Sequence, residues 1–122
     1  MLSYLMNLRQ IRYLKSGHLP EFYAGFILSL KGHKIIHRRY RFFCGEIDLI
    51  SLKGNAVVFT EVKYRKTKQQ AVEAIEPRQV ERIKRAASYF LATGDFDDSH
   101  DVRFDAFLIY EYGSFEHFAN GF

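Results

Sequence analysis

Two carboxylates and a lysine in neighbouring apolar segments are the residues of this chain best suited to chemistry. Asp48 lies in segment 45–50 (GEIDLI), and Glu61 and Lys63 lie in segment 59–63 (FTEVK). Core-forming segments rarely place three ionisable side chains on one face unless a site needs them. Carboxylates that face each other repel unless positive charge lies between them, and a divalent cation together with Lys63 would supply that charge.

A β-hairpin would bring these side chains together. Apolar patterning predicts strands over 34–41, 46–52 and 56–64, and Gly54-Asn55 is a two-residue hairpin signal between the last two. With Gly54-Asn55 as the loop, Asp48 faces Glu61. With Lys53-Gly54 as the loop, Glu46 faces Glu61. Both registers keep the ionisable residues on one face, because side chains alternate along a strand.

A helix is predicted over 19–31, beginning near Pro20 and stopping at Gly32. Glu21 shares a helical face with Ala24 and Leu28, which must pack inward. Two interpretations of Glu21 remain. The carboxylate either complements the dipole of the first turn or belongs to the site.

The rest of the chain alternates between helix and strand signals. Residues 65–75 are interpreted as a polar loop, and a second helix runs from Glu76-Pro77 to Thr93-Gly94. Its apolar stripe comprises Val80, Ile83, Ala87 and Phe90, and its other face carries Arg78, Arg82 and Arg85. A strand follows over 102–110, and a short edge strand over 115–119 follows a turn at 112–114. The predicted fold class is α/β, in the order α-β-β-β-α-β(-β), with a mixed central sheet flanked by helices.

Composition bounds the domain organisation and the compartment. With 122 residues, of which 48% are hydrophobic, the chain is expected to form a single domain over 17–122, preceded by a helical extension over 1–16. The N-terminal segment lacks a signal-peptide pattern and is too short to span a bilayer, so no membrane contact is expected. The single cysteine, Cys44, cannot form an internal disulfide. It is interpreted as a small buried residue in a cytoplasmic protein.

Charge is distributed unevenly along the chain. Residues 1–94 hold 17 Lys and Arg against 7 Asp and Glu, whereas 95–122 hold 1 against 7. Basic groups that converged in space would suit a nucleic-acid backbone, and the alternative is that they only solvate outer faces. The candidate nucleic-acid contacts are Arg38, Arg39, Arg41, Arg65, Lys66, Arg78 and Arg82.

The remaining polar residues carry weaker signals. The five histidines show no metal-ligand spacing, and no role follows for them. Arg103 and Asp105 alternate onto one face of a strand, where a structural ion pair is the favoured interpretation over a place in the site.

Four motifs in order resemble a known family. They are G-x-x-x-E-x-x-A (17–24), GEIDLI (45–50), F-x-EVK-x-R (59–65) and RFD (103–105). The chain, from about Gly17 to its end, looks like the YraN-like family of uncharacterised bacterial proteins. The order of elements resembles the wider PD-(D/E)xK nuclease superfamily. Pro20, Thr60 and Gln79 depart from the usual family pattern.

The resemblance implies a restriction endonuclease-like core and a Mg²⁺-dependent or Mn²⁺-dependent site. Asp48 and Glu61 would bind the metal with the backbone carbonyl of Val62, and Glu21 would be an extra ligand. Lys63 would orient the attacking water or stabilise the attacked phosphate. The implied activity is endonucleolytic hydrolysis of DNA phosphodiesters, with branched or damaged DNA as candidate substrates and a homodimer as the form suited to two symmetric cuts.

Three alternatives stay open at this point. The constellation could be a structural ion-pair cluster, in which Lys63 balances Glu46 and Glu61. The chain could be a non-catalytic nucleic-acid-binding protein that keeps the nuclease-like fold. It could also be an interaction protein that uses its aromatic content and its N-terminal helix for self-association.

Overall fold

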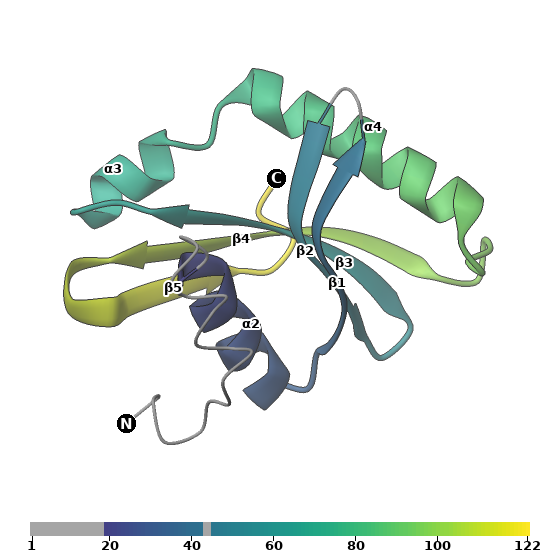
Figure 1. Ribbon diagram of the computed structural model, residues 1–122, viewed down its shortest axis with the longest axis horizontal. Coiled ribbons are helices and arrows are strands. Elements are labelled where there is room, and N and C mark those ends of the chain that lie inside the picture. Colours follow the sequence, from purple (N-terminus) through teal and green to yellow (C-terminus); the bar gives the residue numbers. More distant parts are fainter. Residues whose placement is uncertain (1–18, 43–44) are drawn as a thin grey trace.

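The computed structural model describes residues 19–42 and 45–122 (Figure 1). The predicted helical extension over 1–16, Gly17 of the first motif and the interpretation of Cys44 lie outside the described residues. Within the described ranges, no helix is long and apolar enough to cross a membrane. The elements are α2 (Leu19–Leu30), β1 (Lys34–Phe42), β2 (Gly45–Lys53), β3 (Ala56–Tyr64), α3 (Lys68–Glu73), α4 (Pro77–Thr93), β4 (Asp101–Tyr110), η3 (Glu111–Gly113) and β5 (Ser114–Phe118).

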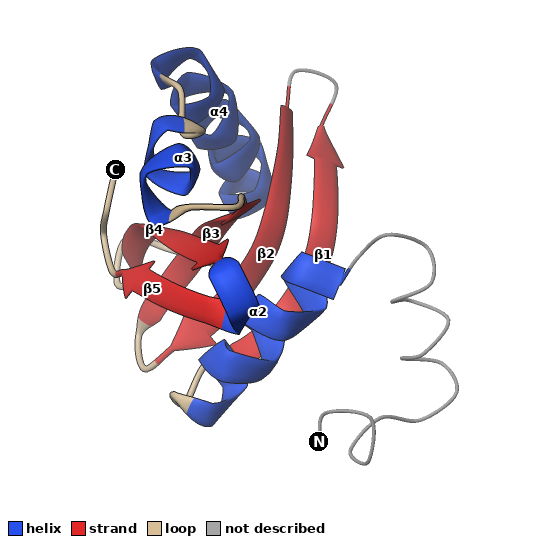
Figure 2. Ribbon diagram, turned by 90° about the vertical axis from the view of Figure 1, so that its left-hand side faces the viewer, coloured by secondary structure: helices blue, strands red, loops and turns tan. Residues whose placement is uncertain are grey.

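The strands form one mixed sheet in the order β1-β2-β3-β4-β5. The β3–β4 pair is parallel, and the other three pairs are antiparallel. Helix α2 covers one face of the sheet, and α3 and α4 lie on the other face (Figure 2). The α/β fold class with a mixed central sheet is thereby confirmed, and the arrangement is consistent with a restriction endonuclease-like core.

The β2–β3 hairpin adopts the first of the two predicted registers. Lys53 pairs with Ala56 and Leu49 pairs with Thr60, so Gly54-Asn55 forms the loop. Gly54 has φ +57°, a conformation that glycine adopts without a steric cost. The register places Asp48 and Glu61 one position beyond the last paired residues.

The prediction of a polar loop over 65–75 was wrong, because Lys68–Glu73 form helix α3. The side chain of Thr67 accepts a hydrogen bond from the backbone of Gln70, whose own side chain accepts one from the backbone of Thr67. This reciprocal capping stabilises the first turn. A helix of six residues is too short for a helical period to show, and Ala71 is its one buried residue.

Apolar side chains pack on both faces of the sheet. Ile50 and Phe59 meet Ile83 of α4 on one face. The residues packed together on the α2 face are Ala24, Leu28, Leu49, Val62, Phe107 and Ile109. Central strands buried on both faces are rigid, so polar groups at their ends are held in place.

One edge of the sheet collects the ends of all five strands. Phe42 pairs with Gly45 and Tyr110 pairs with Ser114, while the parallel β3–β4 ladder ends with Tyr64 beside Ile109. The carboxyl ends of β1, β3 and β4 therefore lie at the same edge as the start of β2 and of β5. This edge is called the Tyr64 edge below.

Candidate functional site

Asp48 sits where β2 parts from β3, near the Tyr64 edge. The last ladder pair of the hairpin is Leu49 with Thr60. Beyond it, the backbone N–H of Val62 donates to Asp48 Oδ2 at 2.8 Å. A side chain therefore bridges the strands in place of the next ladder bond, and the Asp48 carboxylate is fixed between them.

Strand β1 is irregular directly opposite Asp48. Arg38 pairs with Leu49 and Tyr40 pairs with Ile47, and Arg39 between them has φ +52°. A non-glycine residue in this left-handed region is uncommon and carries a conformational cost. The conformational cost in β1 is therefore borne by Arg39, the residue opposite Asp48, which is a candidate metal ligand.

Glu61 is buried beside Asp48, with an exposed fraction of only 4%. Burial is the main cause that raises the pKa of this carboxyl, and the neighbouring Asp48 raises it further. Lys63 opposes that shift, with its Nζ 4.0 Å from Glu61 Oε1. Lys63 is itself only 14% exposed. The structure therefore brings together Asp48, Glu61 and Lys63, three of the predicted site residues.

Gln79 at the start of α4 completes the surroundings of Glu61. Its Nε2 donates to Glu61 Oε2 at 2.9 Å. In the sequence, Gln79 is marked only as a departure from the usual family pattern. The position of Gln79 in the helix, one residue after Arg78, does not predict its contact with Glu61. That contact depends on how α4 packs on the sheet.

The donor set around Asp48 and Glu61 fits a hard divalent cation. Two carboxylates lie together at a partly buried site, where burial first and the neighbouring Asp48 second raise the pKa of Glu61. A cation such as Mg²⁺ or Mn²⁺ prefers carboxylate and carbonyl oxygens, and it would offset the repulsion. Asp48 and Glu61 are therefore the residues that would hold it, with the Val62 carbonyl as a candidate third donor.

Glu21 lies apart from α4. It occupies the first turn of α2, where an acid complements the helix dipole. Ala24 and Leu28 on the same helical face are fully buried against the sheet. The part of Glu21 as an extra metal ligand stays a prediction.

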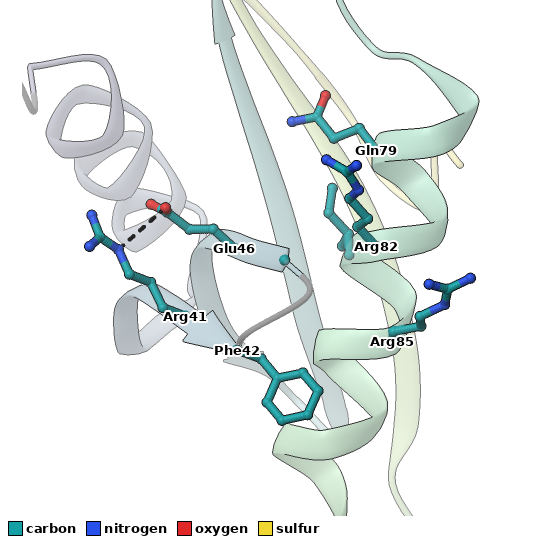
Figure 3. A pocket seen from close by; sticks show the side chains of 8 residues that line it. Arg41, Phe42, Glu46, Gln79, Arg82 and Arg85 are labelled. Carbon is teal, nitrogen blue, oxygen red and sulfur yellow. Dashed lines mark ion pairs between the residues drawn. The ribbon is translucent and has the colours of Figure 1, made fainter.

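A basic groove lies between the end of the β1–β2 hairpin and α4 (Figure 3). Its volume is about 830 Å³, and it is lined by Arg41, Phe42, Gly45, Glu46, Gln79, Arg82, Ile83 and Arg85. Gln79 and Arg82 extend from α4 toward the hairpin, and Arg85 points away from it (Figure 3). Because Gln79 also bonds Glu61, the groove adjoins the acid pair.

Close packing of the hairpin against α4 shapes this groove. A Cβ added to Gly45 would lie 2.8 Å from the carbonyl oxygen of Arg82, a distance that backbone atoms cannot accommodate without moving. Only glycine allows β2 to start this close to α4.

The other predicted nucleic-acid contacts fall in different places. Arg38 reaches toward Gly25 of α2, so it lies on the face opposite α4. Arg39 Nε donates to Glu46 Oε1 at 3.1 Å, and Arg41 Nε lies 3.4 Å from Glu46 Oε2. Arg65 and Lys66 line a separate cleft at the Tyr64 edge, and Arg78 is exposed in the first turn of α4. Of the predicted basic set, Arg41 and Arg82 therefore line the basic groove and Arg65 and Lys66 line the second cleft. The other three, Arg38, Arg39 and Arg78, line neither.

Comparison with known proteins bears on the identity of the chain. The model of a family described as "Uncharacterised protein family UPF0102" matches residues 20–109. The chain belongs to the UPF0102 family. It is 40% identical over 98 residues to a UPF0102 protein of Rhizobium meliloti, with 80% of each chain covered. It is 39% identical over 108 residues to one of Mesorhizobium japonicum, covering 88% of this chain and 86% of that protein. With a Brucella canis UPF0102 protein it shares 42% identity over 89 residues, covering 73% of this chain and 71% of that one.

Family membership confirms the resemblance drawn from the four motifs. Residues 20–109 of the UPF0102 match include Asp48, Glu61, Lys63 and Gln79, and they end before η3 and β5. The UPF0102 description itself assigns no activity.

A second polar cluster of this UPF0102 protein lies on the α2 face, away from Glu61. Asp105 is fully buried, and Arg103 donates to both of its oxygens at 2.9 and 2.8 Å. His117 Nε2 lies 2.7 Å from Asp105 Oδ2, and the backbone N–H of Asn120 donates to Oδ1 at 2.8 Å. The carboxylate is thus surrounded by donors from β4, β5 and the C-terminal tail.

This cluster also gathers two histidines that sequence spacing did not connect. Single ligand atoms of His33, Asp105 and His117 lie within 4.8 Å of one another. However, Lys31 Nζ bonds His117 Nδ1 at 2.9 Å, and Arg103 already neutralises Asp105. The cluster is best explained as an anchor for β5, which agrees with the structural interpretation of Arg103 and Asp105.

His33 in this cluster predicts acid sensitivity of the fold. Burial, His117, Arg103 and Lys53 lower the pKa of His33 from 6.5 to about 4, against the opposing charge of Asp105. The folded state therefore disfavours protonation, and stability should fall as the pH drops from about 6.5 to about 4. His33→Gln should reduce that loss by up to about 3 kcal/mol, because one pKa unit corresponds to about 1.4 kcal/mol. Urea unfolding at pH 7 and pH 4 measures it, and equal losses in both proteins would contradict the account.

Proposed function

We propose that this protein is a metal-dependent endonuclease that hydrolyses phosphodiester bonds in DNA. The observation that carries the proposal is the buried Glu61 beside Asp48, with Lys63 at 4.0 Å, at the border of a basic groove. A structural ion-pair cluster explains this less well, because one lysine at 4.0 Å leaves two neighbouring carboxylates incompletely compensated.

The chain's own residues would position the reacting groups. A bound Mg²⁺ or Mn²⁺ would neutralise charge on the attacked phosphate and make water a better nucleophile near neutral pH. The Val62 N–H holds one oxygen of Asp48, and Gln79 holds one oxygen of Glu61. Each carboxylate would offer its other oxygen to the cation, and that oxygen of Glu61, Oε1, also faces Lys63. Lys63 would donate to the water or to a phosphate oxygen.

The basic groove supports a nucleic-acid substrate. Arg82 extends from α4 toward the hairpin, where Arg41 lies. Arginine donors suit phosphate oxygens, and an open groove allows a long polymer to pass. Glu46 pairs with Arg39 and Arg41, so its negative charge would repel the phosphates of a bound nucleic acid less.

A cleavage assay on end-labelled DNA tests the proposal. Purified protein is incubated with linear duplex, single-stranded, flap and four-way junction DNA, each with Mg²⁺, with Mn²⁺ and with EDTA. Metal-dependent cleavage of at least one substrate is expected, with no products in EDTA. Binding without cleavage in any metal would overturn the proposal and favour the non-catalytic nucleic-acid-binding alternative.

Charge reversal in the groove should weaken DNA binding. Arg82→Glu should lower duplex affinity by about tenfold or more and should flatten the dependence of affinity on salt, because a phosphate contact is lost. Lys34→Glu is the matched control, because it makes the same charge change at the start of β1, whereas the groove lies at the end of that strand, at Phe42. Fluorescence anisotropy titrations in EDTA at several salt concentrations measure both variants. Equal losses in the two variants would show that net charge, and not the groove, governs binding.

A further inference from the structure

A second cleft at the Tyr64 edge is not used by the proposed cleavage reaction. It has a volume of about 790 Å³ and is lined by Tyr64, Arg65, Lys66, Glu111, Tyr112 and Gly113. We propose that this aromatic cleft binds an unpaired nucleobase of single-stranded DNA together with its phosphate. Its place in the cleavage reaction rests on the proposed function, but its binding does not.

Two tyrosine rings give the cleft stacking surfaces. Tyr64 is 54% exposed, and Tyr112 is 104% exposed. Large aromatic rings this exposed are unusual on a folded domain unless a partner covers them. Every nucleobase has a π-face, so tyrosine rings bind unstacked bases of any sequence.

The cleft is built on a fixed turn. Tyr112 has φ +60° and Gly113 has φ +80°, so the chain turns sharply between β4 and β5. Tyr23 of α2 donates its hydroxyl to the Gly113 carbonyl at 2.6 Å. The backbone of Glu111 donates to the Lys66 carbonyl at 3.2 Å, which ties the two walls together. A non-glycine residue in the left-handed region costs free energy, and such residues cluster at active sites and ligand-binding sites.

The charges in the cleft match a nucleotide. Arg65 and Lys66 supply two cations for a phosphate, and Glu111 supplies an acceptor for the amino groups of a base. An apolar or acidic ligand would leave Arg65, Lys66 or Glu111 without a matching group. A purely duplex DNA would not offer a base to the rings, since its bases stay stacked.

The position of the cleft relates it to the acid pair. Both the cleft and the basic groove lie at the Tyr64 edge, but Tyr64 pairs with Ile109 of the α2 face, so its ring lies on the face of the sheet opposite Lys63 and the groove. An unpaired strand that leaves a duplex in the basic groove would have to cross the Tyr64 edge to reach the aromatic cleft. The preferred substrate class is therefore DNA in which a duplex meets a single strand, such as a flap or a frayed junction.

Binding measurements in EDTA test this proposal without any cleavage. The wild type is compared with Tyr64→Ala, Tyr112→Ala, Tyr64→Phe and Tyr112→Phe. The probes are fluorescein-labelled oligothymidylate and a blunt hairpin duplex of equal charge. Each alanine variant should lose about tenfold or more in affinity for oligothymidylate, because a stacked base contributes about 1–3 kcal/mol. The phenylalanine variants, which keep the ring, should stay within about twofold of the wild type, and duplex affinity should be unchanged in all variants.

Three results would overturn the inference. They are wild-type affinity for oligothymidylate in both alanine variants, equal loss of duplex affinity, or no binding of oligothymidylate by the wild type. If the protein cuts no DNA but binds oligothymidylate through its tyrosine rings, the proposed function is wrong and this inference is supported. Cleavage that the alanine substitutions leave unchanged, with unchanged oligothymidylate affinity, would remove this inference alone.

Discussion

Replacing Asp48 by asparagine is expected to lower the DNA cleavage rate by at least about 10²–10³-fold, the usual cost of removing one preorganised group from an active site. The amide oxygen of asparagine can still accept the hydrogen bond from the Val62 N–H, which is 2.8 Å long in the wild type. The substitution therefore removes a negative charge and keeps the local hydrogen bond. Initial rates on the best substrate of the panel, at saturating Mn²⁺, measure the effect.

The thermal stability of Asp48→Asn separates chemistry from folding. Loss of one of two neighbouring carboxylates relieves repulsion with Glu61, so the melting temperature in EDTA should be unchanged or higher. Serine at position 51 of the same strand offers a control, because Ser51 is buried against His33 on the other face. Ser51→Ala should lower stability without changing the cleavage rate of the folded protein. Full activity of Asp48→Asn would remove Asp48 from the site.

Replacing Lys63 by alanine is expected to lower the cleavage rate by about 10²-fold or more. Unlike the loss of a carboxylate, it should not weaken metal binding. Lys63 Nζ is the cation near Glu61, at 4.0 Å. Without it, a divalent cation meets less repulsion, so Mn²⁺ affinity should be equal to or higher than that of the wild type. Low activity with intact metal binding would show that Lys63 acts on the substrate or the attacking water.

Lys63→Arg and Lys53→Ala complete that comparison. Arginine keeps the charge but changes the shape and reach of the donor, so Lys63→Arg should recover only part of the rate. Lys53 lies at the far end of the β2–β3 hairpin, and Lys53→Ala should cut DNA at the wild-type rate. A large rate loss in Lys53→Ala, or none in Lys63→Ala, would show that positive charge in general, and not the position of Lys63, matters.

The sheet was predictable from sequence because its signals are local. Gly54-Asn55 fixed the hairpin register, and that register alone places Asp48 opposite Glu61. Alternation along β3 placed Glu61 and Lys63 on one face without any knowledge of the helices. Helix α3 was not predicted, because six residues are too few to show the helical period of apolar residues. Its capping pair, Thr67 and Gln70, is nevertheless present in the sequence.

The rest of the site depends on contacts between distant segments. Gln79 meets Glu61 only because α4 docks across β2. Tyr112 joins Tyr64 in one cleft only because β4 runs parallel to β3 and ends at the same edge. His33 and His117 are brought together through β4 and β5, so no spacing pattern could connect them. Such juxtapositions follow from the topology, which the sequence pattern limits but does not specify.

If Asp48 and Glu61 share one divalent cation, titration of the metal-free protein with Mn²⁺ should detect that site. Electron paramagnetic resonance of free Mn²⁺ measures how much of the ion the wild type, Asp48→Asn and Glu61→Gln remove from solution. We expect one bound ion per wild-type chain, and an Mn²⁺ affinity lowered by about tenfold or more in both variants, since each loses a charged ligand. Equal Mn²⁺ binding by all three proteins, or none by the wild type, would rule out a cation shared by Asp48 and Glu61.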